Sequence, residues 1–112
     1  MIEFQTERPN ALLNAFKAAI RDGKVRTWEE DKEGDFGHLA QQWKGRGWLH
    51  PEVTPKESLA FFYTAVEPEE DKREVYAYLH SKMIDTFISH FPHLFTFVTA
   101  SPNPTDGDSD LD

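Results

Sequence analysis

The stretch Ser58-Leu-Ala-Phe-Phe-Tyr-Thr-Ala-Val66 decides the fold of this 112-residue chain. Its aromatic and β-branched residues favour a strand, and both alternating sets are largely apolar: Leu59 and Phe61 lie in one set and Phe62 in the other. Such a strand is typically central in a sheet and covered on both sides. The sequence therefore predicts helices on one face and a loop, a second subunit or a ligand on the other.

Two helices are predicted around this strand. Residues 9–22 repeat apolar side chains every three or four positions, as an amphipathic helix does. The acidic residues 67–71 suit a helix N-terminus, and the apolar spacing that follows predicts a long helix to about His90, stopped by Pro92.

The remaining strands are shorter. Residues 24–31 and 35–40 are typical of a β-hairpin, residues 45–50 of a third strand closed by Pro51, and residues 95–100 of a last strand. The prediction is an α+β fold in the order α-β-β-β-β-α-(β). Because neighbouring strands are joined by short connections, we expect an antiparallel sheet of four to five strands with the N-terminal helix and the long C-terminal helix on one face.

The end of the chain has a different composition. Residues 101–112 contain two prolines, one glycine and no aromatic residue, which predicts a disordered acidic tail after a single α+β domain of residues 1–100. Four aspartates lie there: Asp106, Asp108, Asp110 and Asp112. Without them the formal net charge changes from −8 to −4.

Composition excludes several classes of function. The chain has no cysteine, which excludes disulfides, cysteine-ligated zinc and thiol catalysis. It has no basic stripe for nucleic acid and no apolar run near the ~20 residues that cross a bilayer. The first residues lack the basic and apolar blocks of a signal peptide, so the expected location is cytoplasmic, without membrane contact.

The α-β-β-β-α order is similar to that of the double-stranded-RNA-binding domain. That resemblance implies a lysine-rich start of the second helix, where this chain has Glu69, Glu70 and Asp71, so no nucleic-acid partner is expected. In size and charge the chain also resembles small acidic secretion chaperones, which are α+β dimers that hold partner segments. That resemblance is an analogy only.

A polar trio interrupts the apolar stripe of the long helix. Arg73, Tyr76 and His80 lie on the side that faces the sheet and are the candidate ligand-binding residues, with arginine for an anion and histidine for a proton. The alternative is a core histidine bonded to a carbonyl or a tyrosine, with Arg73 reaching water. No nucleophile or second general acid accompanies the trio, so no catalytic residue and no cofactor is assigned.

Aromatic residues supply a candidate interface. Trp28, Trp48 and Phe62 could form a platform on the open sheet face, or they could close a small core from its edges. The leading hypothesis is a non-enzymatic protein-interaction module that self-associates as a homodimer through these residues or binds another protein. The alternative is a small-ligand-binding protein or enzyme with a pocket between the long helix and the sheet.

No metal site is expected. Residues 29–35 resemble the start of a calcium loop, but the twelfth position, a glutamate in such loops, is Ala40. A solvated hairpin tip is the preferred interpretation.

Overall fold

The computed structural model describes the whole chain, residues 1–112, and contains two helices and six strands. In chain order they are β1 (Ile2–Gln5), α1 (Pro9–Arg21), β2 (Trp28–Glu30), β3 (Phe36–His38), β4 (Gly47–Thr54), β5 (Ser58–Ala65), α2 (Lys72–His90) and β6 (Phe97–Ala100). The strands form one antiparallel sheet in the order β2-β3-β4-β5-β1-β6. The predicted α+β class is confirmed. Neither α1 nor α2 combines the length with the apolar composition of a membrane-spanning helix.

The sheet has six strands instead of the predicted four to five, because the first residues of the chain form β1. This strand lies between β5, where Ile2 is opposite Phe61, and β6, where Ile2 is opposite Ala100. Ile2 and Phe4 are fully buried and the other two residues of the strand are not. An alternation over only four residues cannot be told from chance in the sequence. Pairing with β5 and β6 is therefore what makes these residues a strand.

Strand β4 continues past the proline that was expected to end it. Pro51 lies inside β4, opposite Phe61 of β5. On its other side β4 pairs with β3 only at Leu49, so the edge beside Pro51 is free. A proline is tolerated there because its missing N–H would have pointed to solvent.

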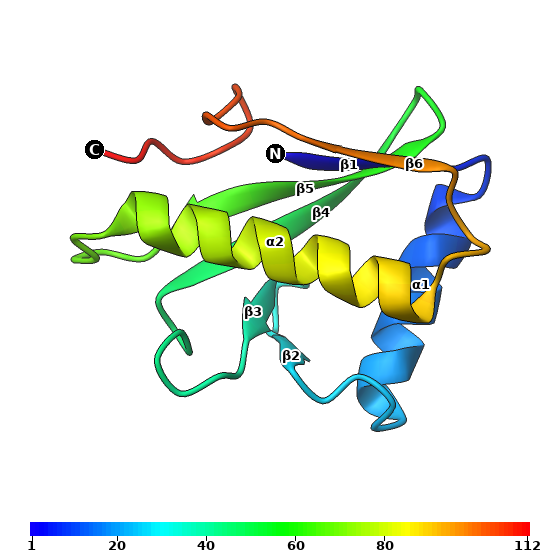
Figure 1. Ribbon diagram of the computed structural model, residues 1–112, viewed down its shortest axis with the longest axis horizontal. Coiled ribbons are helices and arrows are strands. Elements are labelled where there is room, and N and C mark those ends of the chain that lie inside the picture. Colours follow the sequence, from blue (N-terminus) through cyan, green and yellow to red (C-terminus); the bar gives the residue numbers. More distant parts are fainter.

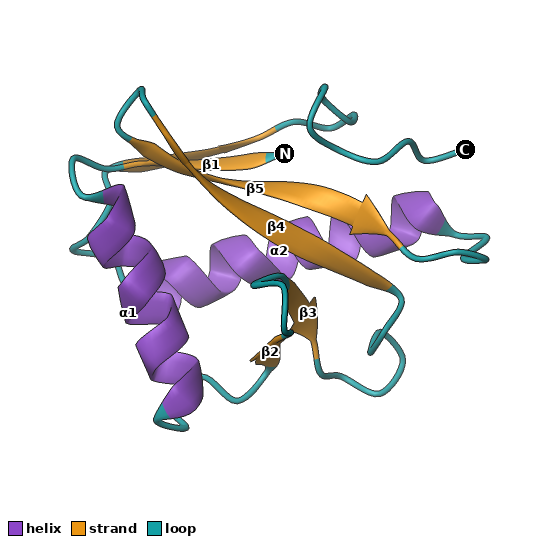
Figure 2. Ribbon diagram, turned by 180° about the vertical axis from the view of Figure 1, so that it is seen from behind, coloured by secondary structure: helices purple, strands orange, loops and turns teal.

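Both helices cover the same face of the sheet. The ring of Phe61 on β5 lies 6.4 Å from the ring of Phe16 on α1 and 5.6 Å from that of Phe87 on α2, centroid to centroid. All three rings are fully buried. Figure 1 shows α2 crossing in front of the strands, with α1 near its C-terminal end, and Figure 2 shows β4 and β5 from behind. The helices therefore bury the Leu59 and Phe61 side of β5, as predicted.

The other side of β5 has no helix over it. Ala60 is buried and Phe62 is half-buried on this outer face. In Figure 1 the last residues of the chain continue from the end of β6 past the N-terminus and make a small loop before the C-terminus. The chain itself thus supplies part of the cover that the sequence predicted.

Candidate functional site

The N-terminus lies in a cluster of polar side chains, which we call the clasp. Since β1 pairs with β5 only as far as Ile2, the Met1 amino group lies beside the end of β5 that β1 does not reach. Its ammonium lies within hydrogen-bond distance of four groups, which define the clasp: Tyr76 Oη at 2.8 Å, Ser101 Oγ at 2.9 Å, His80 Nε2 at 3.0 Å and Asp108 Oδ2 at 3.0 Å. An ammonium has three N–H donors, so this set saturates it.

Helix α2 contributes His80 and Tyr76, whose rings stack one turn apart with centroids 3.8 Å apart. Burial, and secondarily the charge of the Met1 ammonium, lowers the pKa of His80 to about 4. The imidazole is therefore neutral near pH 7, and Nε2 accepts a hydrogen bond from the ammonium. Nδ1 is buried without a partner. His80 thus binds a group that neither sequence interpretation included, the chain's own amino group.

Asp108 is the anion of the clasp, and its side chain is fully buried. Its carboxylate accepts hydrogen bonds from the Tyr63 N–H at 2.7 Å, from the Thr105 N–H at 2.7 Å and from the Thr105 hydroxyl at 3.0 Å. Burial alone would raise the pKa of Asp108, but these N–H donors and the Met1 ammonium hold it below its usual value. Asp108 therefore stays charged and joins both ends of the chain to β5.

The tail, residues 101–112, continues from Asp108 along β5. The Ser109 N–H donates to the Tyr63 carbonyl at 2.8 Å, and the Ala65 N–H donates to Ser109 Oγ at 3.0 Å. Gly107 lies so close to the ring of Phe62 that a Cβ atom at this position would overlap the ring carbons. The tail can make these contacts because the end of β5 offers backbone groups that β1 does not pair.

The first turns of α2 bind the tail on its other side. Arg73 donates to the Pro102 carbonyl at 3.0 Å and to Asn103 Oδ1 at 2.9 Å, and Lys72 Nζ donates to the Asp112 carbonyl at 3.0 Å. The Tyr76 hydroxyl, which accepts from the ammonium, donates to the Ser101 carbonyl at 2.8 Å. We call the set that contacts the tail the tail-binding surface: the Met1 ammonium, Phe62, Tyr63 and Ala65 of β5, and Lys72, Arg73 and Tyr76 of α2.

The structure therefore brings Arg73, Tyr76 and His80 together, as the sequence suggested, but their polar groups contact the chain itself. The three main cavities lie elsewhere, and none is lined by these residues. The missed residues of this site are Met1, Gly107, Asp108 and Ser109. A turn-forming Thr-Asp-Gly-Asp-Ser sequence was the available signal for them, and it was hidden by a composition typical of disorder.

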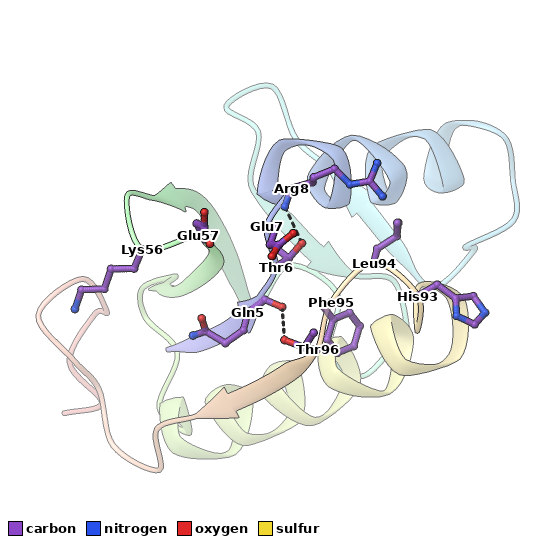
Figure 3. A pocket seen from close by; sticks show the side chains of 10 residues that line it. All are labelled: Gln5, Thr6, Glu7, Arg8, Lys56, Glu57, His93, Leu94, Phe95 and Thr96. Carbon is purple, nitrogen blue, oxygen red and sulfur yellow. Dashed lines mark hydrogen bonds between the residues drawn. The ribbon is translucent and has the colours of Figure 1, made fainter.

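The largest of these cavities, of about 450 Å³, lies at the opposite end of β1. Figure 3 shows residues from the end of β1, the start of α1, the β4–β5 turn and the segment before β6. The side chains of Arg8 and Lys56 extend in opposite directions away from its centre (Figure 3). These two cations therefore do not form a convergent pair that would orient an anionic ligand.

The three predicted interface residues have different positions. Trp28 is only 1% exposed, and its Nε1 donates to Thr86 Oγ1 of α2 at 2.9 Å, so it belongs to the core and not to a surface platform. Trp48 is half-buried on the outer face, where its ring covers Gly37. Phe62 is on the same face beneath Gly107.

The acidic hairpin tip is held by its own backbone. Asp31 Oδ1 accepts the N–H groups of Glu33 and Asp35, each at 2.9 Å, as an aspartate does in a turn. One carboxylate oxygen each of Asp31, Glu33 and Asp35 lies within 4.8 Å of the others, and Asp35 also contacts His50 at 2.6 Å. These contacts are those of a hairpin tip, and they give no reason to assign a metal.

Comparisons with family models, curated proteins and solved structures found no match for this chain. The functional argument therefore rests on the geometry of the clasp and of the tail-binding surface.

Proposed function

We propose that this protein is a non-enzymatic protein-interaction module that binds a turn-containing chain segment at the end of β5 that β1 does not pair. The observation that carries the proposal is the way the tail is held in this structure. Asp108 and Ser109 together engage the backbone of Tyr63 on both its N–H and its carbonyl. Peptide recognition commonly uses the backbone groups that a sheet edge leaves unpaired, as the tail does here through Asp108 and Ser109.

The contacts also select a sequence, which a bare strand edge would not. Only glycine fits between the tail backbone and Phe62, and only a carboxylate satisfies the Met1 ammonium together with the Tyr63 N–H. Main-chain hydrogen bonds supply affinity in this mode of recognition, and such side-chain contacts supply specificity. The surface therefore suits a segment that contains Gly-Asp-Ser.

The alternative function, a small-ligand protein or enzyme at Arg73, Tyr76 and His80, receives less support. These side chains contact the tail and the N-terminus, and no main cavity opens beside them. An enzyme would also need a nucleophile or an acid–base pair next to a space for substrate. Protein recognition requires neither.

A labelled peptide with the sequence of residues 102–112 tests the proposal. The receptor is the full chain carrying Gly107→Val, whose own tail is excluded by Phe62, with the Met1 amine free and an unchanged circular dichroism spectrum. We expect the peptide to bind this variant more tightly than the wild-type chain, because the resident tail no longer competes.

Two altered peptides provide the matched comparison. Asp108→Asn should weaken binding by about tenfold or more, since a charge-assisted hydrogen bond contributes about 1.5–3 kcal/mol. Asp106→Asn should change little, because Asp106 is exposed and forms none of the tail contacts. Equal affinity of the two altered peptides, or no binding to the Gly107→Val chain, would refute the proposal.

A further inference from the structure

We propose that the partner segment is the tail of a second copy, so that two chains exchange tails and form a symmetric dimer. This inference rests on the proposed function and names its partner. Exchange of an identical element between protomers is a low-cost route to a dimer. The sequence predicted self-association through the outer face of the sheet, which the chain's own tail partly covers. Exchange of tails allows self-association even though this face is partly covered.

Complementarity identifies the second copy as the occupant. The tail-binding surface accommodates Gly107, Asp108 and Ser109 of this sequence, and places positive groups, the Met1 ammonium and Lys72, against the Asp108 carboxylate and the Asp112 carbonyl. A second copy has the same tail and the same tail-binding surface, so each chain can bind the tail of the other. No further complementarity is therefore needed for exchange.

The connection between sheet and tail suits exchange. Ser101 stays beside β1 through its N–H, which donates to the Met1 carbonyl at 2.9 Å, and Thr105 begins the turn that contains Asp108. Between them lie Pro102, Asn103 and Pro104. Two prolines restrict the backbone of this short hinge, and a short, restricted hinge is a type of connection at which an element is exchanged between copies.

The reach of the hinge restricts the geometry of the dimer. From Ser101 to Thr105 the chain spans at most about 14 Å when fully extended. The two tail-binding surfaces must therefore lie side by side across the symmetry axis. Trp48, opposite Thr64 in the β4–β5 pairing, is on the outer face next to this surface and would approach the second copy.

The contacts of residues 105–112 are the same in the closed monomer and in the exchanged dimer, so the balance between the two forms depends on other factors. A short tether holds its own tail at an effective concentration on the order of millimolar, which exchange must match. Each copy carries a formal net charge of −8, and salt reduces the repulsion between copies. Exchange should therefore increase with both protein concentration and ionic strength.

Cysteine trapping tests the exchange, because the chain contains no cysteine of its own. One full chain carries Ala65→Cys and another carries Ser109→Cys, at positions where the Ala65 nitrogen and Ser109 Oγ are 3.0 Å apart. The two are mixed in a thiol–disulfide buffer and analysed on non-reducing gels. A mixture of Ser89→Cys and Ser109→Cys chains is the control, since Ser89 is exposed on α2.

We expect the disulfide-linked heterodimer of the Ala65→Cys and Ser109→Cys chains to form about tenfold more than the control heterodimer near 1 mM protein, and to fall to the control level at low micromolar concentration. A single chain carrying both Ala65→Cys and Ser109→Cys should close within itself when dilute. If that chain closes but the mixed heterodimer never exceeds the control, exchange is refuted and the proposed function stands. If the doubly substituted chain also fails to close, the tail does not dock on β5 and both proposals fall.

Discussion

Replacing His80 by glutamine should make this protein less sensitive to mild acid. The folded chain holds the pKa of His80 near 4, against an ordinary value of 6.5, because the ring is buried beside the Met1 ammonium. Between these pH values the unfolded chain binds a proton that the folded chain does not. The free energy of unfolding therefore rises with pH in this window: the full stability is present above pH 6.5 and is lost as the pH falls toward 4.

The size of the loss follows from the pKa difference. One pKa unit corresponds to about 1.4 kcal/mol, so the whole window contributes about 3 kcal/mol, of which about 2 kcal/mol is lost by pH 5. Glutamine is neutral at every pH, and its side-chain oxygen can accept the hydrogen bond from the ammonium. The His80→Gln chain should lack this loss.

Urea unfolding near pH 7 and near pH 5 measures the effect. The wild-type chain should lose about 2 kcal/mol more than His80→Gln on acidification, and the exposed His90→Gln should behave as wild type. An equal loss in the wild type and His80→Gln would refute the reasoning, because His80 would then titrate as it does in the unfolded chain. The clasp geometry around the amino group would be wrong in that case.

Three further substitutions test other parts of the structure. Gly107→Ala adds a methyl group where the underlying ring leaves no space, so protease digestion should release the tail faster than in the wild type; equal rates would argue against tail docking. Trp28→Phe removes the hydrogen bond to Thr86 and leaves a cavity, and should lower the free energy of unfolding by about 1–3 kcal/mol, whereas a surface tryptophan would cost almost nothing. Phe87→Ala should cost about 3–5 kcal/mol in urea unfolding and Ile88→Ala, at an exposed neighbour, about 0.5 kcal/mol or less; similar losses would contradict the assigned helix face.

The candidate site shows where sequence reasoning succeeds and fails. The polarity of Arg73, Tyr76 and His80 within an apolar stripe was visible in the spacing of one helix, and the structure does place them together. Their partners were not visible, since Met1 and residues 101–103 approach them from opposite ends of the chain. An interaction with a chain terminus leaves no periodic pattern in the sequence.

Local periodicity was sufficient for the fold class, both helices and the central strand β5, because each of these elements repeats its apolar side chains within a short window. It also indicated that something must cover the second face of β5. Which segment does so was decided by tertiary structure. The composition of the tail is typical of disorder, but Asp108 and Ser109 form hydrogen bonds with backbone groups of Tyr63 and Ala65 that β1 leaves unpaired. Burial of Trp28 was decided in the same way, because a tryptophan in a short strand is inside or outside according to which face the helices cover.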